Sequence, residues 1–97
     1  MSDITGPSYG VQMWGFGRED QLTEGLHIRQ RSRAFVIAES DAPAKRLVFV
    51  SADLGSIEHH ITLAVIDKLQ KRYGDTYTIA NVIISATHTH AGPGGYW

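Results

Sequence analysis

The run Leu47-Val-Phe-Val-Ser-Ala52 and the later run Asn81-Val-Ile-Ile-Ser-Ala86 decide the fold of this chain. Both runs are short, apolar and rich in β-branched residues, which is typical of strands buried on both faces of a sheet. The residues between them have helical spacing, and a helical crossover between two apolar strands usually makes the strands parallel. The pattern therefore predicts a parallel pair with functional residues at the carboxyl ends of its strands.

The segment between the two runs predicts the most secure helix of the chain. Ser56 is a favourable N-cap residue, and Gly74 is a favourable residue just beyond a last turn. We therefore predict a helix that is capped by Ser56 and ends at Gly74. The apolar residues that recur at helical spacing are Ile57, Ile61, Ala64, Val65, Leu69 and Tyr73.

A third strand is predicted before the first apolar run. Arg31–Glu39 carries β-branched and aromatic residues and leads into the turn-rich stretch Ser40–Pro43, so it should pair with Leu47–Ala52 as a hairpin. Glycine interrupts residues 1–27 repeatedly, which favours mostly loop with at most one short strand. The order strand, strand, helix, strand predicts an α/β fold, with a mixed β-sheet and a helical crossover (β-β-α-β).

The composition is that of one globular domain or part of one, because 42% of the 97 residues are hydrophobic. The net charge of −1 and the lack of a basic run argue against nucleic acid as a partner. The sequence has no cysteine, so a metal would be bound by His, Asp, Glu or Tyr. No signal peptide or membrane-spanning segment is recognisable, so we expect a leaderless, soluble chain whose localisation is open.

Two histidines, His88 and His90, directly follow the second apolar run. In extended backbone, side chains two residues apart leave the same face, so both imidazoles would converge on one ion or one substrate. Imidazole is the usual nitrogen ligand of zinc, and the following stretch Ala91–Gly95 lets the backbone turn close to a ligand. For the bare pair, hydrogen bonding to nearby backbone or solvent is an equally good account.

The stretch Ser85-Ala-Thr-His-Thr-His-Ala-Gly-Pro-Gly-Gly-Tyr-Trp97 resembles the signature of the neutral (non-lysosomal) ceramidase family, in which Thr-His-Thr-His-Ser-Gly-Pro-Gly-Gly is typical. Three positions depart from the family pattern: Trp14 stands for a Met, Phe16 for a Tyr and Ala91 for a Ser. The resemblance covers nearly the whole chain, through the segments Asp3–Pro7, Met13–Gly17, Gly25–Arg29, Ser32–Phe35 and Phe49–Asp53.

The resemblance implies a hydrolase that splits ceramide into sphingosine and a fatty acid, with one zinc held by two histidines, a glutamate and a tyrosine. By position, His88 matches a zinc ligand. His90 matches a residue that touches the polar head of the substrate, and Gly15 falls where the backbone approaches that head. The other ligands are expected outside residues 1–97, so we treat the chain as an N-terminal fragment of a larger α/β catalytic domain, inactive without its C-terminal remainder. Family members are often secreted or membrane-associated, which leaves peripheral membrane contact open.

Two other interpretations remain. Barrel-type metal-dependent amidohydrolases also use His-x-His at a strand end, although without the Gly-Pro-Gly-Gly tail. Alternatively, the chain is a non-catalytic remnant or an interaction module.

Asp53 is expected either to orient a histidine as a hydrogen-bond acceptor or to cap the helix. His27 is expected to be an ordinary loop residue, and His59 and His60 are expected to face solvent.

Overall fold

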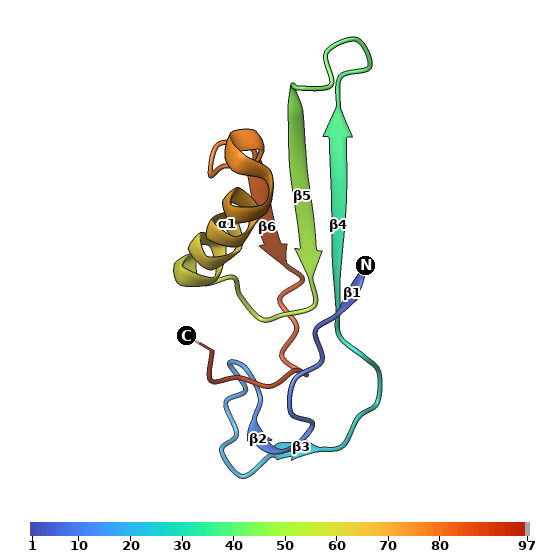
Figure 1. Cartoon of the computed structure of the whole chain (residues 1–97). Coiled ribbons are helices and arrows are strands. Elements are labelled where there is room, and N and C mark those ends of the chain that lie inside the picture. Colours follow the sequence, from blue (N-terminus) through green and yellow to red (C-terminus); the bar gives the residue numbers. More distant parts are fainter. Residues whose placement is uncertain (97) are drawn as a thin grey trace.

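The computed structural model of the chain describes residues 1–96, so Trp97, the last residue of the motif, lies outside the described part (Figure 1). Two sheets, one helix and a short 3-10 turn make up this part of the chain. In order, the elements are β1 (Ser2–Asp3), β2 (Tyr9–Gln12), β3 (Leu22–Glu24), β4 (Arg31–Ala38), β5 (Arg46–Ala52), α1 (His59–Tyr73), the 3-10 turn Gly74–Thr76 and β6 (Val82–Ala86).

The larger sheet has the strand order β1-β4-β5-β6. Strands β4 and β5 form an antiparallel hairpin, whereas β5 and β6 are parallel and are joined through α1. Phe35, Phe49 and Ile83 occupy one row across the three strands. The predicted α/β fold, with a mixed sheet and a helical crossover, is therefore confirmed.

The N-terminal part of the chain contains more strand than predicted. β1 pairs antiparallel with the start of β4, and β2 pairs with β3 in a separate two-stranded sheet. Figure 1 places β2 and β3 beyond the ends at which β5 and β6 finish. The prediction of at most one short strand was wrong, because these strands are two to four residues long and are defined by distant pairing, not by a local pattern.

The helix begins later than predicted. Its N-cap residue is Glu58, which makes no side-chain cap hydrogen bond, whereas the Ser56 hydroxyl donates to the Glu58 carboxylate. The prediction that Ser56 caps the helix was therefore wrong, since its hydroxyl already has a side-chain partner. The predicted end is confirmed, because Gly74 has φ 59° and its N–H donates to the carbonyl of Gln70.

The core lies between α1 and one face of the sheet, where Val48, Ile66 and Val82 are buried together. The opposite face is not covered within residues 1–96, because Phe49 and Ile83 remain 37% and 49% exposed. The expectation that these strands are buried on both faces does not hold in this part of the chain, since one helix covers one side only. No helix in residues 1–96 is long and apolar enough to cross a membrane.

Candidate functional site

The segment that carries the histidines continues from β6 along the end of β5. The Thr87 N–H donates to the carbonyl of Ala52 at 2.9 Å, and the Thr89 N–H donates to the carbonyl of Leu54 at 3.2 Å. These bonds extend the parallel pairing past the last residue of each strand. The histidine segment is therefore fixed to the carboxyl edge of the sheet, as predicted.

His88 has an unusual backbone conformation, with φ 63°. It is the one non-glycine residue with a positive φ in residues 1–96. Such a conformation costs about 1–3 kcal/mol and is found preferentially at functional sites. The assumption of extended backbone here was wrong, because β6 already ends at Ala86. The two imidazoles nevertheless come together, with 4.9 Å between the centroids of the His88 and His90 rings.

A turn from the N-terminal part of the chain is attached to the histidine segment. The Trp14 N–H donates to the carbonyl of Gly92 at 3.0 Å, and the Gly94 N–H donates to the carbonyl of Gln12 at 2.8 Å. Met13 and Pro93 form an isolated β-bridge between these two bonds. The turn at residues 13–16 is thereby held beside the imidazoles, although it is distant in sequence.

The two histidines differ in their hydrogen bonding. The His90 Nδ1 atom lies 3.0 Å from the carbonyl oxygen of Trp14. Because a carbonyl only accepts, Nδ1 carries the proton and Nε2 keeps a free lone pair in the neutral ring. His88 is exposed, and its ring makes no hydrogen bond to the described residues, so both of its nitrogens are available to a ligand. The alternative of hydrogen bonding to backbone or solvent stays open for both rings, because His90 contacts the Trp14 carbonyl and the exposed His88 ring can reach solvent.

Gly15 lies directly against His90. A Cβ atom at this position would be 2.9 Å from Cε1 and 3.0 Å from Nδ1 of the His90 ring. Its φ of 59° also disfavours any other residue. The structure therefore brings together the three predicted site residues, Gly15, His88 and His90, while the roles assigned to them stay predictions.

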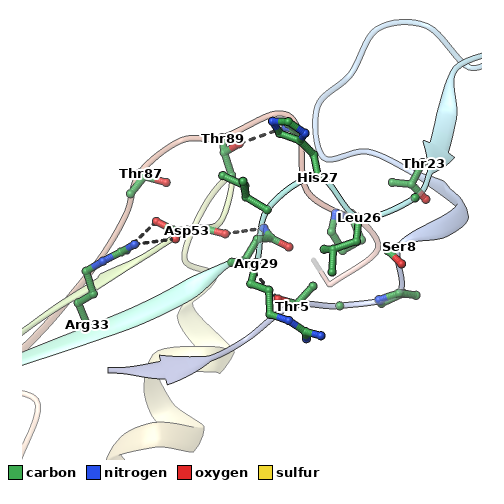
Figure 2. A pocket seen from close by; sticks show the side chains of 17 residues that line it. Thr5, Ser8, Thr23, Leu26, His27, Arg29, Arg33, Asp53, Thr87 and Thr89 are labelled. Carbon is green, nitrogen blue, oxygen red and sulfur yellow. Dashed lines mark hydrogen bonds and ion pairs between the residues drawn. The ribbon is translucent and has the colours of Figure 1, made fainter.

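Asp53 is a structural ion-pair partner. Its carboxylate accepts two hydrogen bonds from the Arg33 guanidinium, at 2.8 and 3.1 Å, and one from the N–H of Arg31 at 2.8 Å. Figure 2 shows the Arg33 side chain pointing at this carboxylate, next to Thr87 and Thr89. Both expectations for Asp53 were wrong within residues 1–96, because its carboxylate is bound by Arg33 and Arg31 and not by a histidine or the first turn of the helix.

The hydrogen bonds from Arg33 hold the pKa of Asp53 below its ordinary value, against a smaller opposing effect of partial burial. A lowered pKa contributes stability above the ordinary value near 4, and this contribution is lost as the pH falls through the folded-state pKa. We therefore expect Asp53→Asn to lower the urea midpoint of the full-length protein by a constant amount between pH 8 and 5. The difference from wild type should shrink below about pH 4. A difference that stays the same at pH 3 would contradict this assignment.

A cavity of about 460 Å³ lies beside the Asp53 ion pair (Figure 2). Thr87 and Thr89 line this cavity, whereas the histidines that alternate with them contact Trp14 instead. His27 also lines the cavity from an exposed loop, and its imidazole is not part of the His88–His90 pair. His59 and His60 are exposed at the start of α1, as expected.

The part of the chain that the structure describes contains no group of three or more His, Asp or Glu residues that would hold a metal ion. A catalytic zinc site needs three protein ligands and one open position. Residues 1–96 therefore supply at most part of such a site. The free nitrogens of His88 suit that partial role.

Gly55 is a site residue that no sequence pattern marked, since a glycine after a strand is common. It is buried, and a Cβ atom there would lie 2.0 Å from the Trp14 ring. Its N–H donates to the Tyr96 hydroxyl at 3.0 Å. The only signal in the sequence was indirect, namely the large residue at position 14 where the resembled family has a methionine.

Comparison with protein-family models gives a match over residues 1–97, to a family described as neutral/alkaline non-lysosomal ceramidase, N-terminal. Neutral ceramidase 3 of Arabidopsis thaliana is 50% identical over 94 residues, which cover 97% of this chain. Neutral ceramidase of Pseudomonas aeruginosa is 46% identical over 95 residues, which cover 98% of this chain. The chain spans 13% of the plant protein and 14% of the bacterial one.

Solved structures give the same result. A crystal structure of neutral ceramidase from Pseudomonas aeruginosa matches with a TM-score of 0.91 and 46% identity, over 97% of this chain and 15% of that chain. A structure described as ceramidase complexed with C2 matches with a TM-score of 0.90, over 97% of this chain and 14% of that one. At 46% identity the similarity extends beyond the fold to the sequence.

Proposed function

This chain belongs to the neutral/alkaline non-lysosomal ceramidase family, and from that premise we propose that the full-length protein hydrolyses the amide bond of ceramide, giving sphingosine and a fatty acid. The relatives named as neutral ceramidases support this substrate, since they match almost the whole of the chain. Because the chain belongs to this family, we reject the alternative interpretation as a barrel-type amidohydrolase.

The observation that carries the proposal is the exposed His88 imidazole, which lies beside His90 at the carboxyl edge of the sheet, with Gly15 against the other histidine. In this proposal His88 supplies one ligand to a zinc ion, and the remaining ligands come from parts of the protein outside residues 1–97. When bound, such a zinc lowers the pKa of a water molecule to about 7 and polarises the amide carbonyl.

His90 and Gly15 are proposed to contact the polar head of the substrate. The proton on Nδ1 of His90 is committed to the Trp14 carbonyl, so Nε2 is left to accept a hydrogen bond from a substrate hydroxyl. Gly15 has no side chain, so the head group can approach its backbone closely. The 97 residues alone are proposed to be inactive, because a single zinc ligand does not hold a catalytic ion.

The test is ceramide turnover by the full-length protein before and after removal of metal. We expect release of sphingosine by the protein as purified, loss of turnover after treatment with a chelator, and recovery on adding zinc. Folded, zinc-loaded protein that leaves ceramide intact would overturn the proposed substrate. Turnover that resists complete removal of metal would overturn the proposed zinc.

A further inference from the structure

The indole ring of Trp14 contacts both imidazoles of the site. Its centroid lies 5.2 Å from that of His88, with the planes at 74°, and 5.1 Å from that of His90, with the planes at 55°. The two imidazoles are also in contact with each other, so the three rings form a closed aromatic group. Edge-to-face and tilted arrangements at these separations are favourable for aromatic rings.

The indole is itself held by the backbone. It rests on Gly55, where a Cβ atom would lie 2.0 to 2.5 Å from three atoms of the ring, so no space is left on that side. The Trp14 N–H and carbonyl are both engaged, with Gly92 and with the His90 ring. The indole is therefore fixed between the buried loop at Gly55 and the two histidines.

His88 needs such support more than His90 does. The His90 ring has a hydrogen bond to the backbone, but the His88 ring has none to the described residues and is exposed. An exposed imidazole without a partner samples several rotamers, and ordering one of them on binding a metal costs affinity. The contact between the indole and the His88 ring restricts this freedom before any ligand binds.

We propose that Trp14 is a positioning residue, whose indole holds the His88 imidazole in the orientation that binds a metal ion. This inference rests on the proposed function only in taking the metal to be zinc. The orientation of the His88 ring in the metal-free protein tests it independently. The free energy of one aromatic contact of this kind corresponds to about 2–10-fold in metal affinity.

The experiment compares Trp14→Leu and Trp14→Phe in the full-length protein. Leucine keeps apolar bulk on Gly55 but has no ring, whereas phenylalanine keeps an aromatic ring beside His88. Tyr73→Leu is the matched control, because Tyr73 is an aromatic residue at the far end of α1 and packs on Tyr77. Zinc affinity is measured by competition with a chelator, and the His88 rotamer is read from crystal structures of the metal-free variants.

We expect Trp14→Leu to weaken zinc binding about 2–10-fold, with His88 in more than one rotamer. Trp14→Phe and Tyr73→Leu should stay close to wild type in both measurements. A leucine variant with one ordered His88 conformer, as in wild type, would overturn the proposal whether or not its zinc affinity changes. A protein that orients His88 through Trp14 but does not hydrolyse ceramide would sustain this inference and overturn the proposed function.

Discussion

Replacing His88 by alanine in the full-length protein is expected to remove the bound zinc and to lower ceramide turnover by about 10³-fold or more. The loss follows because the metal supplies several kcal/mol of charge stabilisation, and about 1.4 kcal/mol corresponds to a factor of ten in rate. The measurement is zinc content by elemental analysis together with kcat and KM for ceramide. The His88 ring is exposed, and its nitrogens make no hydrogen bond to the described residues, so they are available for ligation.

Two other histidines serve as controls for His88→Ala. His59→Ala changes an exposed ring at the start of α1 and should leave zinc and turnover unchanged. His90→Ala should keep zinc and mainly raise KM, since His90 is proposed to contact the head group. An alanine variant at position 88 that retains one zinc per protein and wild-type turnover would exclude His88 as a ligand.

Replacing Gly55 by alanine is expected to destabilise the protein by about 1–3 kcal/mol, as overpacking of a filled site does. The added Cβ would lie 2.0 Å from the Trp14 ring, so the indole must move away from the backbone. Because the indole contacts His88 and His90, zinc affinity should fall together with stability. The urea midpoint and zinc affinity of the full-length protein are the two measurements.

Gly17→Ala is the matched control for Gly55→Ala. A Cβ atom at Gly17 meets nothing within 4 Å, and its φ is not in the left-handed region. This variant should therefore match wild type in midpoint and in zinc affinity. If Gly55→Ala behaves like Gly17→Ala, the indole does not depend on the backbone at Gly55, and the account of the aromatic group is wrong.

The local sequence pattern was sufficient to predict the main sheet and its helical crossover. The runs at 47–52 and 81–86 became β5 and β6, and Gly74 ends α1 as predicted. The pattern failed where pairing is between distant residues, as in β1 and β2. It also failed at the helix start, because Ser56 found a side-chain partner in Glu58 that competes with capping.

Spacing and resemblance together located Gly15, His88 and His90, and the structure brings these residues into contact. The left-handed backbone of His88 was not predictable from spacing, because a His-x-His pair in a strand would need no such strain. The partners of Asp53 and Gly55 were missed for a different reason. Their contacts, with Arg33 and Trp14, are made across elements that only the folded chain places side by side.

The central claim is that the imidazole of His88 ligates the metal of a ceramide hydrolase. Diffraction from crystals of the full-length, zinc-loaded protein, collected on both sides of the zinc absorption edge, tests it most directly. The account predicts an anomalous peak within bonding distance of a ring nitrogen of His88, with ligands from outside residues 1–97 completing the site. A zinc peak elsewhere, with the His88 ring turned away from it, would contradict the account.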